Sequence, residues 1–185
     1  MKILAISGSL RAASINSALL RAIVRSAPDG MNIEIFQRLG ELPLFNPDLE
    51  IKIPTAVDDF RCRVAVADAI LIASPEYAHG VTGAMKNALD WLVGYESFFQ
   101  KTVAILNTSP RAQHADAALR EILKTMAANI IESASVSIPL LGAGLDENGM
   151  LQTPSVVEAI RKTLSSLNEA VTFRRPSQSA SFPVQ

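Results

Sequence analysis

Three short polar segments of the chain hold the residues that could do chemistry, and the first is Gly8–Asn16. It follows the apolar run Ile3–Ile6 and precedes a segment with helical spacing. In a strand-to-helix loop, the free N–H groups and the positive end of the helix point at a ligand, and Arg11 can add charge-assisted bonds to an anion. These groups suit a phosphate that carries no magnesium ion. The neutral donors of the segment are Ser9, Ser14 and Asn16.

The same segment has a simpler interpretation, an ordinary loop in which Ser14 caps the following helix. Two known phosphate motifs do not apply to it. No Gly-Lys-Ser/Thr is present, so it is not a Walker loop, and the dinucleotide fingerprint is excluded because Gly8 is the only glycine available. The local features favour phosphate binding over the simple cap.

The second segment, Pro75–Gly80, follows the apolar run 69–73. A proline, an aromatic residue and a nearby glycine at a strand end can form a flat wall, lined by the backbone, for a ring system. Taken by itself, a plain turn with Tyr77 packed against the sheet is the simpler interpretation. His79 has the pKa range of an acid or base, but a solvated loop histidine is again the simpler reading.

The third segment, Asn107–His114, follows the apolar run 102–106. Its polar groups include Ser109, which could cap a helix or contact a ligand. The chain has no Gly-x-Ser-x-Gly motif, which disfavours a hydrolase. Its single cysteine, Cys62, forms no metal-ligand spacing with the two histidines, so we expect neither an internal disulfide nor a metal site.

Short apolar runs alternate five times with amphipathic segments, which predicts a doubly wound α/β domain. Such a domain is a parallel sheet with right-handed crossovers and helices on both faces. Ligands bind it beyond the carboxyl ends of the strands, so the three segments should lie close together. Hairpin signals typical of an all-β fold are missing. We expect strands at 3–6, 33–36, 69–73, 102–106 and 134–138, and helices from 14, from 55 to about 68, over 83–93, around 119–126 and over 156–171.

Length and composition predict one domain and exclude several classes of protein. The 185 residues are 49% hydrophobic and 19% charged, with a net charge of -1, which argues against a nucleic-acid binder. No apolar run approaches the roughly 18 residues of a membrane span, and the start lacks signal-peptide architecture, so we expect a cytoplasmic protein. We assign the domain to 1–173 and expect a mobile tail at 174–185.

Read together and in order, three motifs resemble the NADPH-dependent FMN reductase family of flavodoxin-like proteins. The resemblance covers roughly residues 1–171 and implies a five-stranded sheet of order 2-1-3-4-5. The motifs are Gly8-Ser9-x-Arg11-x-x-Ser14-x-Asn16, Ser74-Pro75-Glu76-Tyr77 and Lys86-Asn87-Ala88-x-Asp90-Trp91.

The resemblance also implies a binding site for FMN. Its phosphate would be held by Ser9, Arg11, Ser14 and Asn16, with the backbone of Ile15. Its isoalloxazine ring would be lined by Pro75, Glu76 and Tyr77, largely through main-chain atoms, and by Ser109 on the third segment. No catalytic acid or base is implied.

Two positions depart from the family pattern. Ala78 stands where the family usually has asparagine, and the loss of that amide bears on flavin affinity or substrate preference. The loop 108–114 replaces a segment that is commonly glycine-rich, and its bulk narrows the space for an acceptor.

By this resemblance the protein is an FMN-dependent NAD(P)H oxidoreductase. It would pass hydride from NADPH or NADH to FMN and then electrons to a small acceptor such as a quinone, chromate, azo or nitro compound. The helix that holds Lys86–Trp91 would make the contacts of a homodimer or homotetramer. The alternatives are a flavodoxin-like electron carrier and a flavin-free interaction module, and the near-neutral charge favours the enzyme over a carrier.

Overall fold

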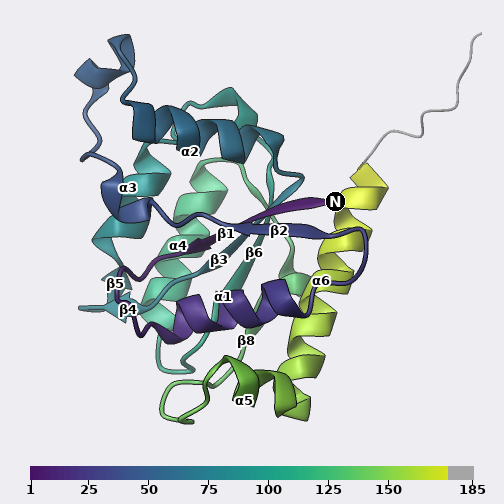
Figure 1. The fold of residues 1–185 in the computed structure, drawn as a ribbon. Coiled ribbons are helices and arrows are strands. Elements are labelled where there is room, and N and C mark those ends of the chain that lie inside the picture. Colours follow the sequence, from purple (N-terminus) through teal and green to yellow (C-terminus); the bar gives the residue numbers. More distant parts are fainter. Residues whose placement is uncertain (175–185) are drawn as a thin grey trace, which may run out of the picture.

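A parallel sheet forms the centre of the molecule in the computed structural model, which describes residues 1–174 (Figure 1). Its strands run in the order β2-β1-β3-β6-β7, where β7 is Asn129–Ile130, and β8 (Val136–Ser137) also pairs with β6. Every residue of β3 and nearly every residue of β1 and β6 is buried, as expected for strands covered on both faces. The four longer strands are β1 (Lys2–Ser7), β2 (Asn32–Ile35), β3 (Ala69–Ala73) and β6 (Thr102–Asn107).

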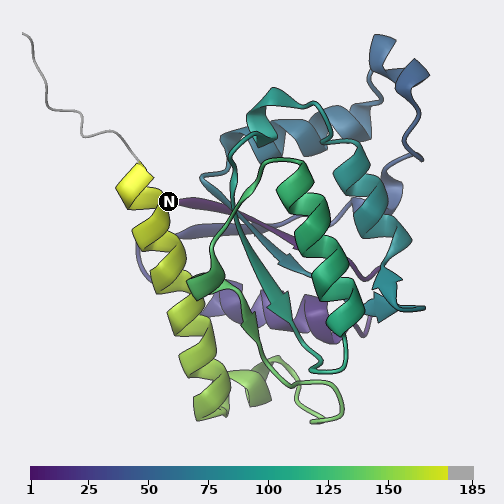
Figure 2. The same ribbon diagram turned by 180° about the vertical axis from the view of Figure 1, so that it is seen from behind.

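Helices cover both faces of this sheet (Figures 1 and 2). Successive residues of β1 point to opposite faces, so Ile3 enters one core and Leu4 the other. The first core is shared with α1 (Ile15–Arg25), α5 (Glu147–Gln152) and α6 (Pro154–Arg174), and the second with α2 (Thr55–Val66), α3 (Gly83–Asp90) and α4 (Gln113–Thr125). The predicted doubly wound architecture is confirmed. The helix expected over 83–93 ends earlier, and α5 was not expected.

The fifth strand differs from its prediction. In place of one strand at 134–138, β7 (Asn129–Ile130) and β8 (Val136–Ser137) flank the short helix η4 (Glu132–Ala134). The Ser135 hydroxyl accepts the N–H of Ile105 at 3.0 Å and donates to the carbonyl of Ile131 at 2.9 Å. A side chain therefore replaces the main chain in the ladder and interrupts the strand. The observed strand order therefore differs from the predicted order 2-1-3-4-5 in that two short strands, β7 and β8, take the place of the fifth strand.

A small hairpin, unexpected from the sequence, follows β3. It pairs β4 (Glu76–Tyr77) with β5 (Gly80–Val81) across Ala78 and His79. Tight two-residue turns need residues in the left-handed backbone conformation, and an Asn-Gly or Asp-Gly pair in the sequence usually indicates them. Here Ala78 and His79 adopt φ of 48° and 56°, so two ordinary residues take that conformation.

The irregular segment 42–54, which we call the arm, projects from the body (Figure 1). It contains only the short helix η2 (Pro47–Ile51) and follows η1 (Leu39–Glu41). Trp91 donates its indole N–H to the carbonyl of Pro43 at 2.7 Å, and the Asn87 side-chain oxygen accepts the N–H of Phe45 at 2.8 Å. Asn87 and Trp91 belong to the motif that the family resemblance assigns to subunit contacts, and here both bind the arm of the same chain.

The end of α6 differs by one residue from the predicted domain boundary at 173. Arg174 closes α6 and donates to the carbonyl of Gln100 at 2.7 Å, so it belongs to the folded domain. The rest of the predicted tail, 175–185, lies outside the described residues. No helix in the described part of the chain is long and apolar enough to cross a membrane.

Candidate functional site

The three polar segments meet at the carboxyl edge of the sheet, as predicted. Residues of all three line one open pocket of about 290 Å³, which we call the edge pocket. From the first segment these are Ile15 and Asn16, whereas Ser9 and Arg11 line a separate cavity. Leu141, from the loop after β8, also lines it and was not foreseen, because its position depends on a distant strand. The lining residues are Ile15, Asn16, Ser74, Pro75, Glu76, Tyr77, Asn107, Thr108, Ser109, Arg111, Ala112 and Leu141.

The first segment starts with a close approach between two strand ends. Gly8 donates its N–H to the carbonyl of Ala73 at 2.8 Å and accepts the hydroxyl of Thr82 at 2.7 Å. A Cβ atom at position 8 would lie 2.1 Å from the Ser74 side-chain oxygen. Glycine is therefore needed here for space, and it fixes where the loop leaves the sheet.

The start of α1 offers unsatisfied main-chain donors to this edge. Ser14 caps the helix by accepting the N–H of Ser17 at 3.3 Å. The N–H groups of Ile15 and Asn16 donate to no group within residues 1–174. The cap predicted by the simpler interpretation is present, and it still leaves two donors free for an anion.

Asn16 has a role that its sequence position did not reveal. Its side chain is buried, and its oxygen accepts the Thr108 hydroxyl at 3.0 Å. The contact joins the first segment to the third across 92 residues of sequence. It therefore sets the separation of two walls of the edge pocket.

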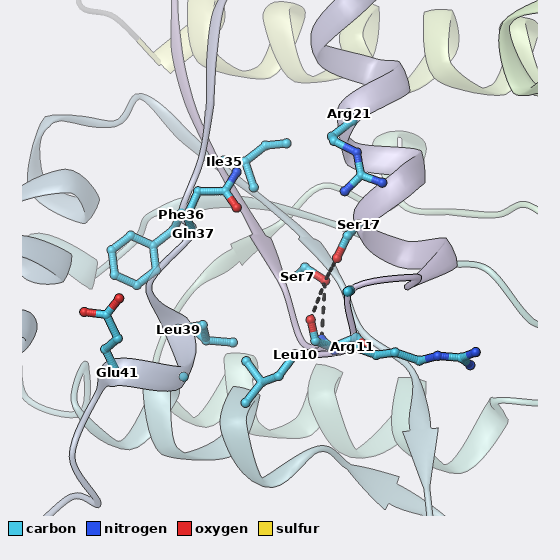
Figure 3. A pocket seen from close by; sticks show the side chains of 13 residues that line it. Ser7, Leu10, Arg11, Ser17, Arg21, Ile35, Phe36, Gln37, Leu39 and Glu41 are labelled. Atoms are coloured by element: carbon cyan, nitrogen blue, oxygen red, sulfur yellow. Dashed lines mark hydrogen bonds between the residues drawn. The ribbon is translucent and has the colours of Figure 1, made fainter. Parts of the chain in front are cut away.

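Ser9 and Arg11 lie at the exposed turn of the first segment. The Ser9 hydroxyl accepts the N–H of Arg11 at 3.4 Å. The Arg11 side chain forms no ion pair within the described residues, and Figure 3 shows it extending away from the sheet. It is available to an anion bound at the start of α1.

The Glu76 carboxylate fastens the hairpin to α4. One oxygen accepts the N–H of Ala115 at 2.8 Å, and the other lies 3.1 Å from Nδ1 of His79. The hydrogen bond from Ala115 lowers the pKa of Glu76, and the contact with His79 adds to this. Glu76 is therefore ionised at neutral pH and does not serve as a proton donor there.

Tyr77 and Ser109 also line the edge pocket, whereas His79 and His114 do not. Tyr77 is 56% exposed, which excludes the interpretation in which it packs against the sheet. The rings of His79 and His114 contact each other edge to face, with 4.6 Å between their centroids. This contact was not predicted, because the two residues lie far apart in the sequence. Ser109 donates its N–H to the Asn107 side chain at 2.9 Å. No cluster able to hold a metal ion occurs in residues 1–174.

The open parallel sheet, with its pocket at the carboxyl edge, defines a doubly wound α/β protein of the class that binds ligands at that edge. The chain belongs to the NADPH-dependent FMN reductase family, whose model matches residues 1–141. It is thus an oxidoreductase that uses FMN and a nicotinamide cofactor.

Individual relatives support this assignment over most of their length. An NAD(P)H-dependent FMN reductase of Pseudomonas aeruginosa is 36% identical over 176 residues, covering 90% of this chain and 93% of the relative. A probable NADPH:quinone oxidoreductase of Oryza sativa is 32% identical over 188 residues, covering 94% and 93%. In fold, the chain resembles the flavoenzyme FerB, an NAD(P)H:(acceptor) oxidoreductase from Paracoccus denitrificans. The TM-score is 0.78 at 24% identity, covering 91% and 97%.

Proposed function

We propose that the edge pocket and the start of α1 bind FMN, with the phosphate at the helix. The observation that carries this proposal is that the N–H groups of Ile15 and Asn16 donate to nothing within residues 1–174. Arg11, in the loop before them, forms no ion pair in the same part of the chain. Ser9, Arg11 and Ser14 complete the donor set. Neutral donors, one cation and a helix terminus match the charge and geometry of a phosphate monoester.

The isoalloxazine ring belongs, in this proposal, between the second and third segments. Pro75, Glu76, Tyr77 and Ala78 offer main-chain atoms from one side and Ser109 from the other. Ala78 has φ of 48°, a conformation that asparagine adopts more readily than alanine. Alanine at this position therefore keeps the main-chain wall but supplies no amide and adds local backbone strain.

The proposed reaction is oxidation of NADPH or NADH coupled to reduction of a small acceptor. Bound FMN supplies the hydride acceptor and electron donor, and the chain supplies binding and orientation. A quinone is the acceptor class best supported, because several relatives are named as quinone reductases. Chromate, azo and nitro compounds make similar demands on an open flavin face and are further candidates.

The absorption spectrum of the purified protein, before and after anaerobic addition of NADPH, tests this function. We expect a yellow protein that bleaches. A yellow protein that stays yellow contradicts the reductase and favours an electron carrier. A colourless protein that FMN cannot reconstitute contradicts the flavin site and favours an interaction module.

We also propose that the enzyme works as a homodimer or homotetramer in the cytoplasm, where nicotinamide cofactors are available. The arm supports self-association because it exposes Leu44 at 83% and Ile51 at 94% on a projecting segment. Large apolar side chains on such a segment favour burial against another surface. Light scattering on wild type and a Leu44→Ser, Ile51→Ser double variant tests this. A monomeric wild type contradicts it.

A further inference from the structure

A second cavity, of about 350 Å³, lies beside the loop that holds Leu10 and Arg11 (Figure 3). It is bounded by α1 on one side and by the end of β2 with η1 on the other. Ser9 and Leu10 line this cavity, whereas Ile15 and Asn16, a few residues on, line the edge pocket. The edge pocket therefore begins, along the chain, just after the loop that lines this cavity.

The cavity combines an apolar surface with polar groups on α1. Phe36 and Leu39 are buried beside it, and Leu10 is 62% exposed at its margin. Opposite them, Ser17 and Arg21 lie one helical turn apart on the same face of α1 (Figure 3). A ligand that fits needs a flat apolar part and an anionic part.

Arg21 is the cation best placed for that anion. Its Nε pairs with Glu147 on α5, and its two terminal nitrogens hydrogen-bond to nothing within residues 1–174. A guanidinium presents five N–H donors in a fixed fork, so the pair with Glu147 leaves donors for a phosphate. Arg11 also borders the cavity but extends away from it (Figure 3).

The one carboxylate that lines the cavity does not cancel Arg21. Glu41 lies at the far end, where its carboxylate accepts Nε of Arg38 at 2.7 Å. The hydroxyls of Ser7 and Ser17 lie 2.8 Å apart near Arg21 and add neutral polar groups. Arg21, although paired with Glu147, is thus the cation that the cavity presents on α1, away from Glu41.

We propose that this cavity binds the adenosine 2′-phosphate end of NADPH, with the purine over the apolar surface and the phosphate at Arg21. The inference rests on the proposed function, because it places the nicotinamide at the edge pocket, beyond the start of α1. A volume near 350 Å³ is at the small end of ligand sites and suits one nucleoside phosphate. NADH lacks this phosphate, so Arg21 sets the preference for NADPH.

Calorimetry with adenosine 2′,5′-bisphosphate and adenosine 5′-phosphate tests the site without requiring turnover. In the FMN-loaded protein, Arg21→Gln should weaken binding of the bisphosphate about tenfold, the loss expected for a charged hydrogen bond, and change binding of the monophosphate less. Arg25→Gln is the matched control. Arg25 lies one turn further on α1 and also reaches across to α5, through Asn148, but it does not line the cavity.

Three results overturn the proposal. They are no binding of the bisphosphate to wild type, unchanged binding in Arg21→Gln, and equal losses in the Arg21 and Arg25 variants. Steady-state rates add a second readout. The factor by which Arg21→Gln raises KM for NADPH should be about ten times the factor by which it raises KM for NADH. A wild type that binds the bisphosphate but oxidises neither dinucleotide contradicts the proposed function and leaves the phosphate site supported.

Discussion

Glu76 accepts a hydrogen bond from the main-chain N–H of Ala115 at 2.8 Å, so one carboxylate joins the hairpin after β3 to the first turn of α4. Glu76 and Tyr77 of the hairpin line the edge pocket, and so does Ala112, the residue just before α4. The helix start provides a free N–H group and a partial positive charge, both of which favour an ionised carboxylate. The side chain of Glu76 is thus a positioning group for the pocket wall.

Removal of this contact should loosen the flavin site more than it disturbs the core. We expect Glu76→Ala to raise the Kd for FMN several-fold, because the hairpin loses its bond to α4. Glu76→Gln should lie closer to wild type, since its amide oxygen can still accept from Ala115. Fluorescence titration with FMN measures both. Equal affinities in wild type and Glu76→Ala contradict the positioning role.

The lowered pKa of Glu76 makes part of the stability depend on pH. A carboxylate whose pKa is lower in the folded state stabilises the fold fully above its unfolded value, here 4.5. That contribution is lost as the pH falls through the folded-state pKa. The difference in Tm between wild type and Glu76→Gln should therefore be larger at about pH 6, above that value, than at about pH 3, below it. A constant difference at lower pH contradicts this account.

Substitution of Gly8 should be destabilising for steric reasons. In Gly8→Ala the new methyl group meets the Ser74 oxygen at 2.1 Å and its Cβ at 2.7 Å. Crowding of this kind costs about 1–3 kcal/mol. Urea denaturation should show that loss, and Ser74→Gly in the same chain should recover part of it. No recovery in the double variant indicates that the cost arises elsewhere.

The buried bond between Asn16 and Thr108 should couple the two segments energetically. Thr108→Val leaves the Asn16 oxygen without its partner, which costs about 1–3 kcal/mol. A double-mutant cycle with Asn16→Ala measures the coupling free energy from denaturation curves. Strict additivity of the two changes argues that the bond contributes nothing of its own.

Arg11 should affect flavin binding and leave folding nearly unchanged. It forms no ion pair within the described residues, so Arg11→Ala removes little from the folded protein. We expect its Kd for FMN to rise about tenfold, the effect of one charge-assisted bond to phosphate. Arg161→Ala, which changes an exposed ion pair on α6, is the control. Unchanged FMN affinity in the Arg11 variant removes this residue from the proposed site.

The local sequence determined the main strands and the place of the site. Runs such as Ile3–Ile6 and Ala69–Ala73 are apolar at every position, which is the pattern typical of a short strand buried on both faces. Since parallel strands end at one edge, the segments that follow them had to converge. The membership of individual residues in the flavin site stays a prediction.

The tertiary structure decided the features that depend on partners far away in the chain. Ser135 interrupts the last strand because its hydroxyl meets Ile105, 30 residues earlier, and Glu76 finds its partner 39 residues later. Trp91 anchors the arm through Pro43, across 48 residues. A polar side chain can bond to any group that folding brings near it. Local periodicity therefore sets which segments are buried, and the packing of those segments sets which polar groups meet.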